Sequence, residues 1–191
     1  QQLLQFARSC QPLTEFAPET SIAASAAMLS LDNAGDWVRP GIMLYGSSPF
    51  AWSDSERRRD QFDLHNVMTL KAQLISVRQH EAGDSIGYNS QFICPRAMRV
   101  GIVSIGYADG YPVTAANGTP VVVGNTRTGT VGRVSMDMLT IDLTQCPHAH
   151  VGDLVTLWGD ALPVDEVAAS LGIISYQLLA GLGGRVLREY C

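Results

Sequence analysis

Two tyrosines that each follow a glycine could present phenol hydroxyls for chemistry. Tyr88 follows Gly87, and Tyr107 follows Gly106 directly after the apolar run 99–105. That run is short and rich in β-branched residues, which is typical of a buried strand. The next segment, Gly-Tyr-Ala-Asp-Gly-Tyr-Pro, predicts a tight turn that holds aromatic hydroxyls at the strand end. Tyrosine is also an ordinary core and interface residue, so a purely structural role stays open at this point.

An arginine earlier in the chain is the second candidate. Arg39 lies between an apolar pair and Pro40-Gly41. Arginine is seldom buried without a partner, so this position is unusual. Gly41 has no side chain to cover its backbone, and an anion could therefore approach the N–H groups there.

The first elements expected to position these residues lie around them. Residues 1–9 have the apolar spacing of an amphipathic helix. The small apolar segment 21–29 predicts a buried parallel strand that passes into a short helix, with Ser25 near the junction. Residues 47–64 are polar and irregular, and they are the best candidate for a linker.

The remainder of the chain predicts short strands and two helices. Alternation over 67–80 indicates a long strand with one solvated face. Strands are then expected near 99–105, 119–123, 128–134, 137–143 and 153–158, followed by helices at 164–171 and 175–182 and a closing edge strand at 185–190. Strands of this length and spacing suggest a small β-barrel or sandwich.

Composition excludes several classes of function. Hydrophobic residues make up 46% of the 191 residues, which allows a real core, and the length permits one domain or one domain plus part of another. The net charge of −5 argues against nucleic acid as the main partner. No apolar run approaches the roughly 18 residues that span a membrane. The four cysteines lack CxxC spacing and the histidines lack ligand spacing, so we expect reduced thiols in a cytoplasmic protein and no metal site.

Six blocks, in order and in rough register, resemble alanine racemase, a fold-type III enzyme that uses pyridoxal 5'-phosphate (PLP). The blocks lie at 21–27, 36–46, 87–88, 105–112, 131–138 and 174–179. The resemblance implies a mainly β chain. Residues 1–62 would be the C-terminal remnant of a (β/α)8 PLP barrel, and residues 63–191 a small β-barrel-like C-terminal domain.

By this resemblance Tyr88 matches the catalytic tyrosine. Racemisation needs two proton-transfer groups on opposite faces of a planar carbanion, and the family uses this tyrosine and the PLP-linked lysine. A phenol titrates near 10 in water, so the site must favour its anion before it can act as a base. Family enzymes are homodimers in which the tyrosine acts in the partner subunit's site.

The cofactor contacts carry over in the same way. Arg39 matches the arginine that hydrogen-bonds the PLP ring nitrogen, and Ser25 with the amides of Gly41 and Ile42 matches the phosphate cradle. A guanidinium does not give up its proton in the useful pH range, so the ring nitrogen stays unprotonated. We expect this to favour racemisation over transamination.

The substrate contacts would come from the C-terminal domain. Met136, together with Asp137, matches the segment whose backbone amide holds the substrate carboxylate, and Tyr107 and Arg133 match residues that line the access channel and the surroundings of the site. Val113 stands where the family usually has a basic residue, which bears on substrate preference.

The only lysine, Lys71, does not resemble the family's PLP-linked lysine. It alternates with Thr69 and Gln73 on the expected solvated face of the strand 67–80, so we expect a surface residue. The chain, which begins without an initiator Met, would therefore need a missing N-terminal barrel segment and would be inactive alone.

The expected function is that of part of an enzyme that interconverts L-alanine and D-alanine, for peptidoglycan synthesis or for D-alanine degradation. One alternative is a racemase of another or broader specificity, because a hydrophobic pocket discriminates a methylene by only about 1–3 kcal/mol. The other is a β-barrel assembly module without chemistry.

Overall fold

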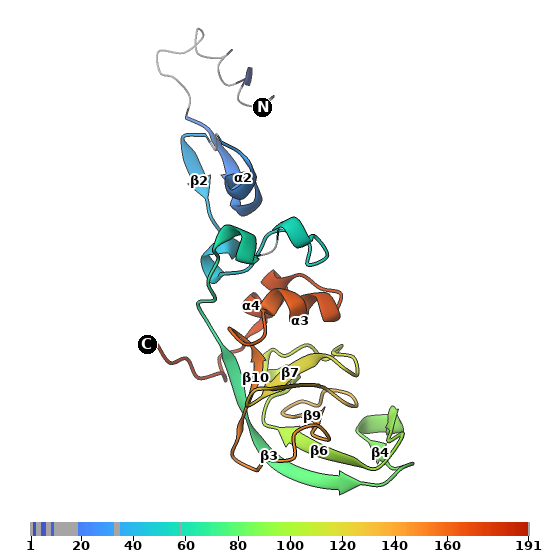
Figure 1. The fold of residues 1–191 in the computed structure, drawn as a ribbon. Coiled ribbons are helices and arrows are strands. Elements are labelled where there is room, and N and C mark those ends of the chain that lie inside the picture. The colour runs from blue at the N-terminus through green and yellow to red at the C-terminus, as the bar shows by residue number, and fades with distance from the viewer. Residues whose placement is uncertain are drawn as a thin grey trace. The chain divides into compact units, whose positions relative to one another are not determined.

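The computed structural model describes residues 2, 5, 6, 9, 19–32, 35–57 and 59–190 (Figure 1). The chain divides into two units, residues 1–67 and residues 68–191, which are described separately. Most of the predicted helix 1–9 lies outside the described residues. Among the residues that are described, no helix is both long and apolar enough to cross a membrane.

The first unit contains two parallel strands joined through a helix. Strand β1 (Ser21–Ala24) passes directly into helix α2 (Ser25–Ser30), and the chain returns as β2 (Trp37–Arg39). Ala24 pairs with Arg39 in the parallel register. The connection follows from the geometry, because parallel neighbours cannot be joined by a tight hairpin. The strand and helix predicted over 21–29 are therefore confirmed.

The polar segment 47–64, which the sequence predicts as a linker, lies within the first unit and is buried at its start. Ser47 and Ser48 are buried, and the rings of Phe50 and Phe62 lie 5.7 Å apart. Three short 3-10 turns shape the region around this segment: η2 (Ile42–Tyr45), η3 (Ser55–Arg57) and η4 (Arg59–Phe62). Serine hydroxyls can be buried when they are hydrogen-bonded, and Ser48 Oγ accepts a bond from the Phe50 N–H.

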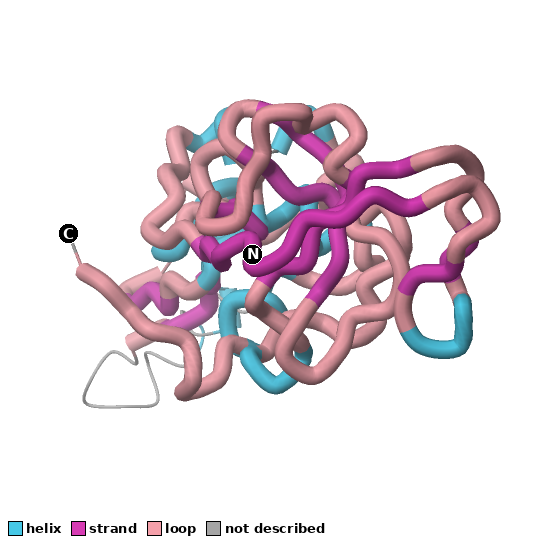
Figure 2. The backbone as a smooth tube through the Cα atoms, turned by 90° about the horizontal axis from the view of Figure 1, so that it is seen from below, coloured by secondary structure: helices cyan, strands magenta, loops and turns pink. Residues whose placement is uncertain are grey.

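The second unit is built on a curled antiparallel sheet with the strand order β8-β7-β10-β3-β6-β9 (Figures 1 and 2). Its strands are β3 (Leu70–His80), β6 (Met98–Val103), β7 (Pro120–Val123), β8 (Thr126–Gly129), β9 (Leu139–Asp142) and β10 (Leu154–Trp158). Thr130 and Ile141 form a β-bridge, and Thr128 Oγ1 donates to the Asp142 carbonyl, so the two ends of the sheet approach each other. The predicted mainly β chain with a barrel-like C-terminal domain is confirmed.

Smaller elements decorate this sheet. A hairpin of β4 (Ser85–Ile86) and β5 (Phe92–Ile93) encloses the turn η5 (Tyr88–Ser90), and η6 (Tyr107–Asp109) follows β6. Helices α3 (Val164–Ser170) and α4 (Ser175–Gly181) confirm the two predicted helices.

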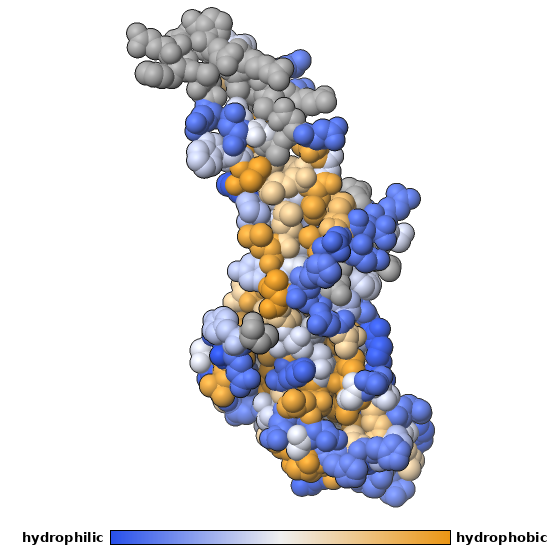
Figure 3. Space-filling view, turned by 60° about the vertical axis from the view of Figure 1, so that its left-hand side comes forward, coloured by the Kyte–Doolittle hydropathy of each residue, from blue (hydrophilic) through white to orange (hydrophobic). Residues whose placement is uncertain are grey.

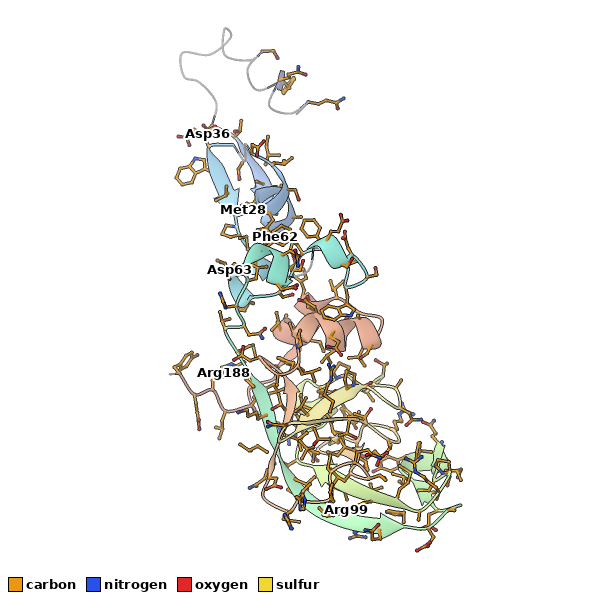
Figure 4. All side chains as sticks on the ribbon, in the orientation of Figure 1. Met28, Asp36, Phe62, Asp63, Arg99 and Arg188 are labelled. Carbon is orange, nitrogen blue, oxygen red and sulfur yellow. The ribbon has the colours of Figure 1, made fainter. Side chains whose placement is uncertain are left out.

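The edge strand predicted at 185–190 is wrong. This segment forms no strand, and its side chains Leu187, Arg188 and Tyr190 are exposed. Arg188 is labelled on this segment in Figure 4. Its start is fixed elsewhere, because the Gly183 N–H donates to the Asp109 carbonyl at 2.9 Å. Strand β8 is also shorter than expected: of the predicted segment 128–134, residues 130–134 take part only through the bridge at Thr130.

The core of the second unit explains why the sheet holds together. Leu74, Val103, Ile141 and Val155 are fully buried, and the rings of Tyr111 and Trp158 stack with centroids 6.3 Å apart. Burial of such side chains contributes about 1.5–3 kcal/mol each. A smaller cluster lies under the β4–β5 hairpin and consists of Ile86, Cys94, Met98, Val100 and Val131.

Candidate functional site

In the first unit, four predicted site residues meet at one edge of the β1–β2 pair. Ser25 directly follows β1, and Arg39 is the last residue of β2. Because the strands are parallel, their carboxyl ends share an edge, and Gly41 and Ile42 follow β2 there. Ser25 is distant from the other three residues in sequence, but the pairing of Ala24 with Arg39 places it next to them.

The Ser25 hydroxyl and two successive amides lie close to each other at this edge. The Gly41 N–H donates to Ser25 Oγ at 2.9 Å, and a side chain at position 41 would lie 3.7 Å from the same oxygen. Ile42 begins the turn η2, and no residue in the described part of the chain accepts a hydrogen bond from its N–H. The first amides of a helical turn lack acceptors within that turn, so this amide is free to bind an anion together with the hydroxyl.

Arg39 has unused donors. Its Nη1 donates to both the backbone carbonyl and the hydroxyl of Ser21, each at 2.6 Å. Within the described residues its Nε and Nη2 have no acceptor. A guanidinium fixed through one nitrogen and exposed through the others can orient a ring nitrogen or an anion.

In the second unit, Tyr88 projects from the hairpin β4–β5. Of its surface, 69% is exposed, and its hydroxyl has no hydrogen-bond partner among the described residues. Two residues beside it that are not glycine have left-handed backbone, Asn89 with φ +58° and Ser90 with φ +50°. Left-handed backbone in a residue other than glycine costs on the order of 1–3 kcal/mol and clusters at functional sites. Tyr88 thus lies beside backbone of this kind, with its hydroxyl free to contact another molecule.

The hairpin lies against the loop that contains Arg133. A Cβ at Gly87 would stand 3.3 Å from the Arg133 nitrogen, so the two backbones approach closely. The Gly132 N–H donates to Asn117 Oδ1 at 2.6 Å, which fixes the loop. The Arg133 side chain is exposed. The structure thus places Tyr88 and Arg133 on adjoining loops.

Tyr107 and Met136 lie on two turns joined by their backbones, which we name the tyrosine turn (106–110) and the methionine turn (135–138). The Tyr107 N–H donates to the Ser135 carbonyl at 3.1 Å, and the Ala108 N–H donates to the Met136 carbonyl at 2.9 Å. Only glycine fits at position 106, because a Cβ there would lie 2.3 Å from the Met136 oxygen. Met136 is 53% exposed, and its N–H has no acceptor within the described residues, so it can bind an oxygen anion.

An arginine that the sequence did not indicate lies beside these turns. Arg185 Nη2 donates to Asp137 Oδ1 at 2.7 Å, and its Nε lies 3.2 Å from Asp109 Oδ1. The bond to Asp137, followed by the charge of Asp109, raises the pKa of Arg185 above its ordinary value. Asp109 also accepts a bond from the Gly106 N–H at 2.9 Å and is buried. The available signal was the presence of a carboxylate on each turn, Asp109 and Asp137, because neighbouring carboxylates need a cation close to them.

Lys71 is exposed on β3, opposite Thr156 of β10, as its alternation predicts. Asp109 and Tyr111, which belong to the tight turn predicted after the run 99–105, are both buried.

Comparisons with known proteins give one consistent result. The family model for the alanine racemase C-terminal domain matches residues 67–190, and that for the alanine racemase N-terminal domain matches residues 1–49. Alanine racemase of Thiobacillus denitrificans is 52% identical over 169 residues, which are 88% of this chain and 45% of that protein. The catabolic alanine racemase of Pseudomonas putida is 49% identical over 191 residues, which are 100% of this chain and 51% of that protein.

The solved structures agree. The biosynthetic alanine racemase of Pseudomonas aeruginosa superimposes with a TM-score of 0.88 at 47% identity, over 98% of this chain and 52% of that chain. The chain spans about half the length of the curated relatives it matches. With matches of this extent and identity, the chain belongs to the alanine racemase family.

Proposed function

We propose that this chain forms the C-terminal half of a PLP-dependent alanine racemase that interconverts L-alanine and D-alanine. The observation with most weight is Tyr88, an exposed phenol without a partner on a strained hairpin. The relatives include biosynthetic and catabolic enzymes, so the proposal covers both supply of D-alanine for peptidoglycan and its degradation. The proposed enzyme is a cytoplasmic homodimer in which Tyr88 enters the partner's site.

The residues at the β1–β2 edge fit PLP. The Ser25 hydroxyl and the Ile42 amide would hold the phosphate, because the Ile42 amide has no acceptor in the described part of the chain. The Gly41 amide, which donates to Ser25 Oγ, would join them by turning from that oxygen to the phosphate, and no side chain at Gly41 blocks the approach. Arg39 would bind the ring nitrogen with donors that Ser21 leaves free. Bound PLP supplies an electron sink that stabilises negative charge on the substrate Cα.

Tyr88 would move the proton on one face of the substrate. Its phenolate oxygen takes the Cα proton, or its hydroxyl returns one. The base on the other face would be a lysine from the other half of the enzyme. Lys71 does not suit that role, since it lies on the exposed face of β3.

The two turns of the second unit would orient alanine. The free Met136 amide would bind the substrate carboxylate, while Tyr107 and Arg133 would line the approach to the site. Asp137, which lies next to Met136, is bonded to Arg185 and would act on the carboxylate through the shape of the turn.

The test is Tyr88→Phe in the holoenzyme that contains this chain together with the lysine-bearing half. Phenylalanine keeps the ring and removes only the oxygen that transfers the proton. We expect kcat for alanine racemisation to fall by about 10²- to 10⁴-fold, with little change in KM. Tyr190→Phe, at a tyrosine 92% exposed on the C-terminal segment, should leave both constants unchanged. A Tyr88→Phe enzyme with the unmodified kcat would refute the assignment.

Broader specificity is the second candidate, and Val113 favours it. Val113 is partly exposed directly after the Gly-Tyr-Pro end of the 106–112 segment, where the resemblance predicts a basic residue. Without that charge the channel would discriminate less between side chains. Turnover of alanine, serine and lysine by the same holoenzyme distinguishes the two, and a larger amino acid that reacts faster than alanine would replace alanine as the substrate.

A further inference from the structure

We propose that Arg185 is a positioning residue that ties the methionine turn to the tyrosine turn and thereby sets the direction of the Met136 amide. The inference rests on the proposed function, because it concerns the amide assigned there to the substrate carboxylate. The carboxylates that Arg185 bridges belong to different turns, Asp109 to the tyrosine turn and Asp137 to the methionine turn.

The backbone seats the segment before Arg185 independently of its side chain. The Gly183 N–H donates to the Asp109 carbonyl at 2.9 Å. Gly110 and Gly181 touch so closely that a Cβ at Gly110 would lie 2.0 Å from the Gly181 oxygen. The guanidinium therefore starts from a fixed point on the tyrosine turn, and what the side chain adds is the link to Asp137.

On the tyrosine turn this link reaches a rigid anchor. Asp109 Oδ2 accepts the Gly106 N–H, while Oδ1 faces Arg185, and the Asp109 side chain is only 12% exposed. A carboxylate that holds a backbone amide with one oxygen and a guanidinium with the other cannot move without breaking one of the two bonds.

The methionine turn, by contrast, has an exposed tip. Met136, Asp137 and Met138 are all exposed, and within the turn the Ser135 N–H donates to the Met138 carbonyl. Below the tip the turn is joined to the tyrosine turn through the Ser135 and Met136 carbonyls. In the described part of the chain, the bond from Arg185 is the one side-chain hydrogen bond that holds the tip itself.

The expected consequence is kinetic rather than structural. Arg185 is 54% exposed, and exposed ion pairs contribute little to folding stability. A misdirected amide, however, weakens the binding of a carboxylate in the ground state and the transition state alike. Loss of the tie should therefore raise KM and leave kcat nearly unchanged.

The test compares Arg185→Met with Arg127→Met in the holoenzyme. Arg127 is a matched control because its side chain is 53% exposed and it pairs with Glu166 of helix α3, a residue that belongs to neither turn. We expect Arg185→Met to raise the KM for alanine about threefold to thirtyfold, with kcat and Tm nearly constant. Arg127→Met should change none of these. Arg185→Lys, which keeps the charge but lacks the planar fork, should give an intermediate KM.

A second measurement separates this inference from the proposed function. Hydrogen exchange of the amides at 135–138 should be faster in Arg185→Met and unchanged in Arg127→Met, whether or not the enzyme racemises alanine. If the holoenzyme has no racemase activity, the proposed function is refuted, but the exchange measurement still tests whether Arg185 holds the methionine turn. In an active enzyme, unchanged exchange or an unchanged KM would refute the positioning role.

Coupling to Asp137 completes the test. Asp137→Asn should raise KM as Arg185→Met does. The KM of the double variant should be no higher than that of the single variant with the higher KM, because both changes remove the same interaction. Additive effects would show that Arg185 acts by another route. If Arg185→Met fails to fold, Asp137→Asn alone decides the question, since an unchanged KM there contradicts the tie.

Discussion

The predicted cofactor residues and the predicted proton-transfer and substrate residues are supported in different ways. Ser25, Arg39, Gly41 and Ile42 lie at the carboxyl ends of two short parallel strands, and large hydrophobic side chains such as Trp37 are exposed on these strands. Orange patches of such side chains are visible on the first unit in Figure 3. The tyrosine and methionine turns are instead attached to strands β6 and β9 of a curled sheet, and this sheet encloses a continuous core.

This difference shows what each set of residues needs in order to hold its geometry. Strand β2 is exposed along its length, so little of the first unit's own core fixes Arg39. In the second unit, Gly106 and Gly110 press directly on neighbouring backbone, and Tyr111 stacks on Trp158 in the core. We therefore expect core substitutions to disturb the second unit far more than the first.

The largest effect is expected from a tryptophan pair. Trp158→Ala removes a side chain that is 1% exposed and should lower the free energy of unfolding by about 3–5 kcal/mol. Trp37→Ala removes one that is 60% exposed, and it should change the free energy by less than about 1 kcal/mol. Urea unfolding followed by circular dichroism measures both. Equal losses would abolish the contrast between the units.

Alternation and turn chemistry predicted the parts of the fold that depend on neighbouring residues. Strand β3 was predicted because its side chains alternate between core and solvent, and Ser25 was placed at a strand–helix junction that the structure contains. The segment 185–190 was predicted as a closing edge strand, which the structure does not contain. Its start is instead fixed by Asp109 and Asp137, which lie far away in sequence, and no local pattern reports such a contact.

The polar segment 47–64 is a second case in which local sequence does not predict the tertiary environment of its residues. Serines normally indicate solvent, but Ser47 and Ser48 are buried once hydrogen bonds satisfy them. Likewise the site residues could be named from motifs, whereas the free amides of Ile42 and Met136 depend on three-dimensional pairing of the backbone. Sequence types predict which groups are present, and the fold decides which of them are left without partners.

A smaller effect tests how firmly the tyrosine turn is seated. Gly110 has φ +101°, and a Cβ there would lie 2.0 Å from the Gly181 oxygen, so Gly110→Ala should cost about 2–3 kcal/mol. Gly118 has φ +84°, but a Cβ there would meet nothing within 4 Å, so Gly118→Ala should cost only about 1 kcal/mol. Urea unfolding of both variants isolates the close approach from the backbone strain. A Gly110→Ala cost no larger than that of Gly118→Ala would mean that the C-terminal segment is not pressed on the turn.

The smallest effect, and one of opposite sign, is expected at Tyr111. Its hydroxyl is buried and has no hydrogen-bond partner in the described structure, while its ring stacks on Trp158. Tyr111→Phe keeps the ring and removes an unsatisfied group, so stability at pH 8 should stay equal or rise by up to about 1 kcal/mol. The same substitution that is expected to abolish catalysis at the exposed Tyr88 is thus expected to be harmless at the buried Tyr111.

The pH dependence of this variant sharpens the test. Burial raises the pKa of Tyr111, so the folded protein keeps the phenol proton at a pH where the unfolded chain, which titrates near 10, has lost it. The unfolded state then binds fewer protons than the folded state, and stability falls as pH rises above about 10, by at most about 1.4 kcal/mol per pH unit. Tyr111→Phe lacks this loss, so its advantage should widen between pH 8 and pH 10.5 in urea unfolding. Tyr190→Phe, at an exposed phenol, should show no such widening, and a Tyr111→Phe protein less stable at pH 8 would mean that the buried hydroxyl has a partner after all.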